Sequence, residues 1–143
     1  MNEVLDLTPE EEAYLTSLLE KYNRPNRRPT APRRDLPYFL ERLERLLAQI
    51  ESGYVLTTDD YKNDVWARGI LEEIREGVPE SLGIRLDRAL SEFDERFRSL
   101  TNEVRNPTLG GAPMQWWWYR VPRVASHRSF HDGWSLGQRG QPG

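Results

Sequence analysis

The stretch LPYFLERLERLLAQI, residues 36–50, carries the spacing that decides the fold. Its apolar side chains recur every three or four residues, which is typical of one face of an α-helix. Asp35 stands where an N-cap is expected, and Gly53 stands where helices commonly end. The stretch therefore predicts an amphipathic helix whose buried face is Leu36, Phe39, Leu40, Leu43, Leu46, Leu47 and Ile50.

A second helix is expected at the start of the chain. Thr8 can act as its N-cap, Pro9 occupies the first helical position, and Glu11 completes a capping box. Its apolar stripe is Tyr14, Leu15, Leu18, Leu19 and Tyr22.

Two more helices follow residue 56. One begins after Thr57 or Thr58 and ends at Gly77 and Pro79, and the other is expected over residues 80–105. We expect the first of these to bury Tyr61, Val65, Trp66, Ile70, Leu71 and Ile74. The apolar positions of the second alternate in threes and fours, as at a bundle seam, and are Leu86, Leu90, Phe93, Phe97, Leu100 and Val104.

Four amphipathic helices joined by short or medium loops predict a mostly α, four-helix bundle-like single domain. Residues 1–105 should form the bundle. Residues 106–124 contain a Gly- and Pro-rich linker and an extended, Trp-rich segment that we expect to dock on the bundle. Residues 125–143 are rich in Gly, Ser and Arg, and we expect a flexible tail there.

Composition narrows the class of protein. The 143 residues are 37% apolar and 30% charged, and no run approaches the roughly 18 apolar residues that a membrane-spanning helix needs. The acidic N-terminus lacks the pattern of an export signal, so we expect a cytoplasmic protein that does not bind membranes. There are no cysteines, which excludes disulfides, thiol nucleophiles and Cys-ligated zinc.

The sequence offers weak candidates for catalysis and for metal binding. Residues 133–137, GWSLG, match a nucleophile-elbow pattern around Ser135, but the strand, helix and downstream partners of such a site are missing. His127 and His131 are four residues apart, with Asp132 beside them, but they lie in a glycine-rich tail. We therefore expect no enzyme activity, no cofactor and no metal.

The basic stretch RPNRRPTAPRR, residues 24–34, raises the possibility of nucleic-acid binding. It carries a net charge of +5, from Arg24, Arg27, Arg28, Arg33 and Arg34. Arginines bind phosphate groups well. However, residues 1–23 carry a net charge of −5 and the whole chain carries −3, which favours an arm that neutralises its own acidic neighbours. A nucleic-acid-binding accessory protein remains the alternative.

The helix expected after Thr57 or Thr58 is acidic and is one candidate partner-binding face. Its spacing of four predicts that Arg68 pairs with acids on both sides. One interpretation is a solvated, ion-paired face, and the other is a face for a basic protein such as a toxin or nuclease. The candidate contact residues are Asp59, Asp60, Asp64 and Glu72.

The second candidate face is MQWWWYRVP, residues 114–122. In an extended chain, Trp116 and Trp118 would point to one side, and Trp117 and Tyr119 to the other. Four exposed rings would exceed the usual apolar patch of a monomer, so at least one side must pack on the bundle. The other side, with Arg120, has residue types that are common at interface hot spots. The sequence leaves two alternatives: the segment only packs on the bundle, or it also binds a partner protein.

The run EFDERFRSLT, residues 92–101, followed by WWWYRVP, resembles a set of small bacterial helical proteins. In that set a similar DERF run precedes a Trp-rich segment. More loosely, the chain is similar to helical immunity proteins, which bind and block bacterial toxins. The resemblance covers residues 92–122 and brings no catalytic residues. It implies a non-catalytic protein-binding module that neutralises a cognate toxin by covering its working surface.

Overall fold

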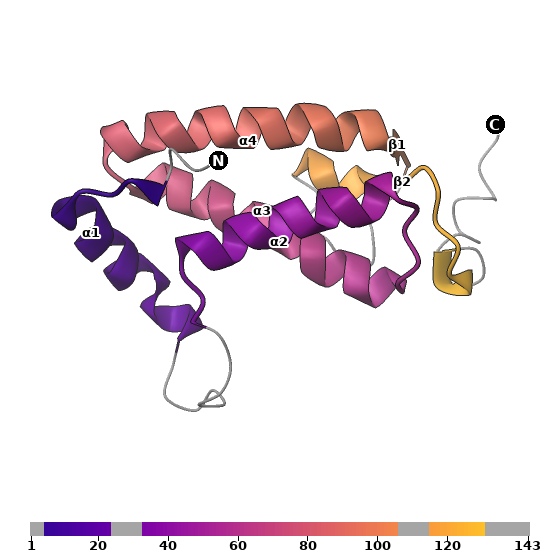
Figure 1. The fold of residues 1–143 in the computed structure, drawn as a ribbon, viewed down its shortest axis with the longest axis horizontal. Helices are drawn as coiled ribbons and strands as arrows, with labels where there is room; N and C mark the ends of the chain where they lie inside the picture. Colours follow the sequence, from indigo (N-terminus) through magenta and orange to yellow (C-terminus); the bar gives the residue numbers. More distant parts are fainter. Residues whose placement is uncertain (1–4, 24–32, 106–114, 131–143) are drawn as a thin grey trace.

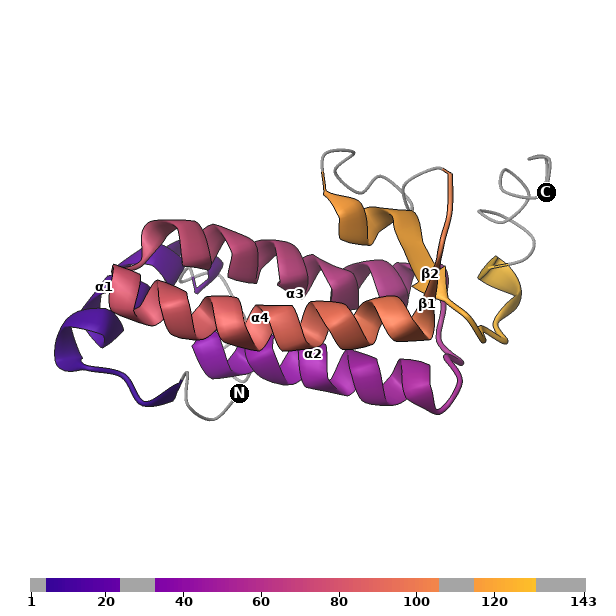
Figure 2. The same cartoon turned by 90° about the horizontal axis from the view of Figure 1, so that it is seen from above.

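The computed structural model describes residues 5–23, 33–105 and 115–130. Three long helices, α2 (Leu36–Glu51), α3 (Thr58–Gly77) and α4 (Glu80–Leu100), run along the molecule, as Figures 1 and 2 show. Helix α1 (Pro9–Leu19) and the 3-10 turn η2 (Glu20–Tyr22) lie across one end of these three. The mostly α, bundle-like fold predicted from the sequence is confirmed.

The predicted helix starts are confirmed because each depends on a local cap. The side chain of Thr8 accepts a hydrogen bond from the Glu11 N–H at 3.1 Å, and the Glu11 carboxylate accepts one from the Thr8 N–H at 2.9 Å. Thr57, rather than Thr58, caps α3 through the same reciprocal arrangement with Asp60. Asp35 accepts from the Tyr38 N–H at 3.0 Å and so caps α2.

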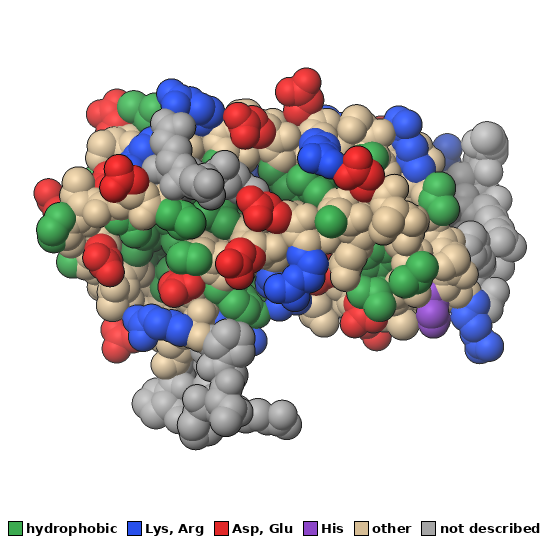
Figure 3. Space-filling view, viewed as in Figure 1, with side chains coloured by type: hydrophobic (Ala, Val, Ile, Leu, Met, Phe, Trp, Pro, Cys, Tyr) green, Lys and Arg blue, Asp and Glu red, His purple; other side chains and the backbone are tan. Residues whose placement is uncertain are grey.

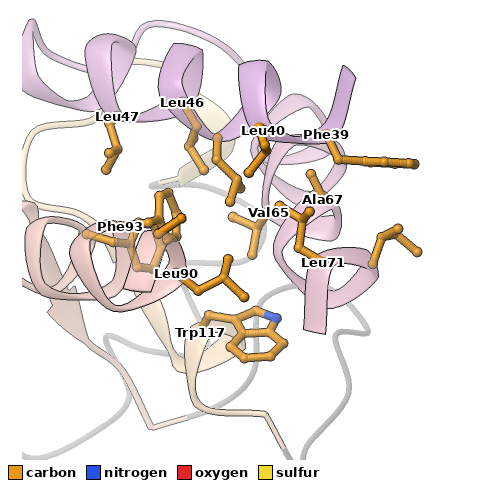
Figure 4. Packing of buried hydrophobic residues seen from close by; sticks show 14 of the residues in the cluster. Phe39, Leu40, Leu46, Leu47, Val65, Ala67, Leu71, Leu90, Phe93 and Trp117 are labelled. Carbon is orange, nitrogen blue, oxygen red and sulfur yellow. The ribbon is translucent and has the colours of Figure 1, made fainter. Parts of the chain in front are cut away.

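The core lies between the three long helices. All seven apolar residues predicted for residues 36–50 are buried on α2. In Figure 4, α2 closes one side of this core, and Trp117 lies on the opposite side, below Leu90. The C-terminal segment thus closes the core across the space between α3 and α4.

Helix α4 ends at Leu100, five residues before the predicted end. Thr101 begins strand β1 (Thr101–Glu103), which pairs antiparallel with β2 (Arg120–Pro122). The Thr101 hydroxyl donates to the Phe97 carbonyl at 2.7 Å, and the Thr101 side chain is fully buried. The apolar period that continued to Val104 was misleading because pairing with a distant strand replaces the last helical turn.

After β2 the chain crosses the end of the bundle. The Tyr54 N–H donates to the Val124 carbonyl, and the Ser126 N–H donates to the Tyr54 carbonyl, both at 2.9 Å. The short 3-10 turn η4 (Arg128–Phe130) then places Phe130 against Tyr54 and Tyr61. Packing therefore continues past the predicted tail boundary at residue 125, as far as Phe130.

Among the described helices, none is both long enough and apolar enough to cross a membrane.

Candidate protein-binding surfaces

The Trp-rich segment forms the 3-10 turn η3 (Trp116–Tyr119), not the extended chain that the sequence suggested. In a 3-10 helix, residues three apart share a face. Trp116 and Tyr119 are accordingly half-buried, whereas Trp117 and Trp118 are buried. The predicted alternation of rings to two sides is therefore wrong, and the segment buries its two central rings.

Trp117 packs on a buried arginine. Arg68 of α3 lies over the Trp117 ring, with 4.4 Å between the guanidinium carbon and the ring centroid. Arg68 also donates two hydrogen bonds to Asp94 of α4, at 2.8 and 2.9 Å, and one to Glu72 at 3.3 Å. This arrangement holds α3, α4 and η3 together. The indole N–H of Trp117 is buried and has no hydrogen-bond partner in the described part of the chain.

We predicted that Arg68 pairs with acids four residues before and after it on α3, and only the second of these pairs forms. Glu72 does pair with Arg68, but the other carboxylate is Asp94, which sequence spacing on a single helix cannot reveal. Asp64 instead accepts hydrogen bonds from Arg42 at 3.3 Å and from Tyr54 at 3.1 Å. It therefore links α3 to α2 and to the chain that follows α2.

Most of the acidic candidate residues on α3 are engaged within the fold. Burial raises the pKa of Asp64, although the Tyr54 and Arg42 hydrogen bonds act to lower it. A hydrogen bond from Arg75 lowers the pKa of Glu72. The Asp60 carboxylate belongs to the α3 capping box. Only Asp59, among the four predicted acidic contacts, is exposed.

Arg120 and Tyr119 are also used by the fold. Arg120 donates to the Thr101 hydroxyl at 2.7 Å and to the Thr101 carbonyl at 2.9 Å, and its own carbonyl accepts from the Tyr61 hydroxyl. The Tyr119 carbonyl accepts from the Val104 N–H at 2.7 Å. Trp116 is half-buried, with exposed Arg98 over its ring at 3.8 Å. Of the predicted aromatic strip, Trp116, with Arg98 over its ring, and Tyr119 are therefore the partly exposed rings.

The remaining sequence candidates contribute little to a site. His127 hydrogen-bonds Ser129 at 2.9 Å, which ties the chain near Phe130. His131, Asp132 and Ser135 lie outside the described residues, as do residues 24–32 of the arginine arm. Arg33 is exposed, and Arg34 lies over the Trp66 ring at 5.7 Å. Within the described residues, no group of three His, Cys, Asp or Glu side chains is arranged to hold a metal ion.

A groove between α2 and α4 was not predicted from the sequence. It has a volume of about 350 Å³ and is lined only by residues of these two helices. Leu47, Ala48, Ala89 and Phe93 form its apolar lining, and the charged lining residues are Glu44, Glu51, Glu92 and Arg96. Arg96 forms an ion pair with Glu51, whereas Glu44 and Glu92 make no ion pair within the described part of the chain.

The other two junctions between the long helices are covered. Trp116 and Trp117 cover the junction of α3 and α4, as described above. Tyr22 packs edge-on against Phe39 of α2 and Trp66 of α3, at 5.8 and 5.9 Å between ring centroids, and so covers their junction near α1. The α2–α4 groove differs because its lining comes from these two helices alone.

A second hollow of about 320 Å³ lies between α1 and the start of α2. Its apolar lining includes Leu15, Leu19 and Leu36, and Arg33, Arg34 and Asp35 add charge. It adjoins residues 24–32, which the structure does not describe. The α2–α4 groove is therefore the better-defined candidate surface.

No family model, no curated protein and no solved structure matches this chain.

Proposed function

We propose that this protein acts by binding another protein, and that the α2–α4 groove is its binding face. The observation that carries the proposal is a groove with an apolar lining and a charged edge, spanning two turns of each helix. Apolar contact area surrounded by a polar rim is the usual arrangement of a protein-binding surface.

The internal contacts of the two predicted faces support this choice. Packing and hydrogen bonds within the fold already involve Trp117, Trp118 and Arg120. Helix caps or ion pairs already involve Asp60, Asp64 and Glu72. Recruiting them to a partner would require breaking contacts that hold the helices together. The exposed Asp59 and the half-buried Trp116 and Tyr119 remain predicted contacts outside the groove.

In its most specific form the proposal makes the partner a toxin. A rigid helical domain that covers the working surface of a basic toxin or nuclease would neutralise it without chemistry of its own. The acidic members of the groove lining suit such a partner because opposite charges speed association. The expected behaviour is stoichiometric inhibition, in which activity reaches its minimum at one copy of this protein per toxin.

The test compares two matched alanine-to-tyrosine variants of the full chain. Ala48 is an exposed residue that lines the groove, and Ala13 is an exposed residue on α1. Ala48→Tyr should fill the groove, and Ala13→Tyr adds the same side chain elsewhere. Both sites are exposed and helical, so both variants should fold, which circular dichroism would verify.

Tagged wild-type protein and both variants would be used to capture proteins from the cells that make the chain, followed by quantitative mass spectrometry. The expected result is a partner captured by the wild type and by Ala13→Tyr but lost with Ala48→Tyr. Calorimetry with the purified partner should then give a 1:1 complex. Identical capture by all three proteins would exclude the groove as the binding face.

A further inference from the structure

We infer that the partner segment seated in the α2–α4 groove is a basic amphipathic helix. This inference rests on the proposed function and adds the chemistry of the occupant. It is carried by the position of the groove in the bundle, by the small residues at its centre and by the charges on its rim.

The position of the groove suits a helix. The three long helices already pack against one another in every pairing, so the groove lies on the outer side of the contact between α2 and α4. Here α1 lies across the end of α2, α3 and α4, so it does not run alongside α2 and α4 (Figures 1 and 2). The groove between α2 and α4 follows these two helices where another bundle helix could lie.

The length of the groove fits a partner helix of a few turns. Glu44 and Glu51 are seven residues apart on α2, and Ala89 and Arg96 are seven apart on α4. At 1.5 Å per residue, each span is about 10 Å, or two helical turns. A partner helix with apolar residues at positions i, i+3 or i+4, and i+7 would place them along this length.

Small residues at the centre of the groove permit close approach. Ala48 is exposed and Ala89 is buried, and both have small side chains, while Leu47 and Phe93, which are 8% and 3% exposed, line the groove beside them. Packed helices lie roughly 8–10 Å apart, depending on the size of the residues at their contact. Leucine-sized knobs from a partner can therefore enter over the alanines and contact Leu47 and Phe93.

The charges favour a basic helix over an acidic one. Three carboxylates and one guanidinium line the groove, and the Arg96–Glu51 ion pair leaves Glu44 and Glu92 available. Figure 3, which has the view of Figure 1, shows acidic and basic side chains interspersed on the face formed by α2 and α4, with apolar side chains between them. Lysine or arginine residues flanking the apolar stripe of the partner can pair with Glu44 and Glu92.

The probe for this inference is a pair of synthetic 18-residue helical peptides, each labelled with fluorescein. Both carry leucine at i, i+3 or i+4, and i+7. One carries lysine at the flanking positions, and the other carries glutamate. Binding to the full-length protein is measured by fluorescence anisotropy at low and at physiological salt.

The lysine peptide should bind at least about tenfold more tightly than the glutamate peptide at low salt, and the difference should shrink as salt screens the charges. Ala48→Tyr should weaken binding of the lysine peptide by about tenfold or more, because the leucines lose their pocket. Ala13→Tyr should leave the affinity unchanged.

Charge variants distinguish an effect of the groove charges on peptide affinity from an effect of the protein's net charge. The double variant Glu44→Lys, Glu92→Lys should bind the lysine peptide more weakly and the glutamate peptide more tightly than the wild type does. Glu20→Lys with Glu76→Lys makes the same change in net charge at two exposed sites outside the groove. A weaker effect from the second pair would locate the interaction at the groove, and equal effects from both pairs would overturn the inference.

The two proposals fail in distinguishable ways. If Ala48→Tyr abolishes capture of a cellular partner but the lysine peptide does not bind, or binds no better than the glutamate peptide, the basic-helix inference is wrong while the binding face stands. If the lysine peptide binds equally to the wild type and to Ala48→Tyr, the groove is not the site of that contact. If no captured protein depends on Ala48, the proposed function itself fails.

Discussion

Arg68 lies over the face of Trp117 at 4.4 Å, and both side chains are almost fully buried. A cation held against an indole ring gains from the electron-rich face of the ring, and the gain grows when water is excluded. The same guanidinium binds Asp94 through two hydrogen bonds, a geometry that arginine provides and lysine does not. The contact explains why the Trp-rich segment sits where α3 and α4 meet.

Removing Asp94 tests this arrangement. Asp94→Ala leaves a buried guanidinium with Glu72 as its remaining carboxylate, and losing one member of a buried ion pair is costly. We expect the free energy of unfolding to fall by about 3 kcal/mol, the lower end of the usual range because Glu72 remains. Urea unfolding, with an unchanged slope, would measure the loss.

The matched control is Glu95→Ala, at the exposed neighbouring position of α4. Its free energy of unfolding should stay within about 0.5 kcal/mol of the wild type, as is usual for exposed sites. Equal effects from the two substitutions would show that the Arg68–Asp94 pair adds nothing to stability.

Two glycines should respond to alanine in opposite directions. Gly69 lies inside α3, and an added Cβ would meet Gln115 and Trp117 at 3.9 Å, an ordinary contact distance. Gly69→Ala should therefore stabilise the protein by about 0.5–1 kcal/mol, because alanine loses less backbone entropy in a helix. A loss of stability would mean that the Trp-rich segment packs more tightly on α3 than the structure indicates.

Gly53 presents the opposite case. Its φ of +95° lies in the left-handed region, which costs other residues about 1–2 kcal/mol. Gly53→Ala should reduce the free energy of unfolding by roughly that amount, measured by the same urea titration. A neutral result would indicate that the chain after α2 can change its path at little cost.

Phe130 should anchor the C-terminal part of the described chain. Its ring is 3% exposed and lies edge-on to Tyr54 and Tyr61, at 5.9 and 5.8 Å. Phe130→Ala should cost about 3–5 kcal/mol of stability, as for other buried aromatic residues. Hydrogen exchange offers a second readout, because the amides of Tyr54 and Ser126 bridge these two segments and should lose protection.

The control for Phe130 is Val124→Ala, since Val124 is 65% exposed on the same segment. It should change neither stability nor the exchange of the Tyr54 and Ser126 amides. If Phe130→Ala behaved like Val124→Ala, the segment would be held by its backbone hydrogen bonds alone.

The features predicted correctly from the sequence depend on residues close together in the chain. Thr8 with Glu11, and Thr57 with Asp60, mark helix starts because a cap involves neighbours three residues apart. The apolar period of residues 36–50 identifies a buried face because that face belongs to one helix. Caps and apolar periods of this kind can therefore be recognised from the sequence alone.

The features that were missed depend on distant parts of the chain. Helix α4 ends at Leu100 because β1 pairs with residues 120–122. Arg68 forms an ion pair with Asp94, which lies on another helix. Phe130 stands alone in a Gly-, Ser- and Arg-rich stretch, so no period marked it as buried. The α2–α4 groove depends on how two helices that are distant in the chain pack together, and the apolar period of either helix does not specify that packing.

Glu11 should make stability depend on pH. Hydrogen bonding from the Thr8 N–H, Arg85 and Ser81 lowers the pKa of Glu11 to about 2. The carboxylate accepts from Arg85 at 2.6 Å and from Ser81 at 2.7 Å, and so ties α1 to α4. Because the folded state holds the ionised form, this contribution is fully present above the ordinary pKa of 4.5 and is lost as pH falls towards 2.

Glu11→Gln tests this sign. Glutamine resembles the protonated carboxyl group and can retain the capping box, but it carries no charge for Arg85. The variant should unfold at lower urea than the wild type at pH 7, and the two midpoints should converge between pH 4.5 and 2. Burial raises the pKa of Asp64, which acts in the opposite direction, but Asp64 is present in both proteins and cancels in the comparison. A gap that stayed constant over this pH range would show that the ionised Glu11–Arg85 contact does not stabilise the fold.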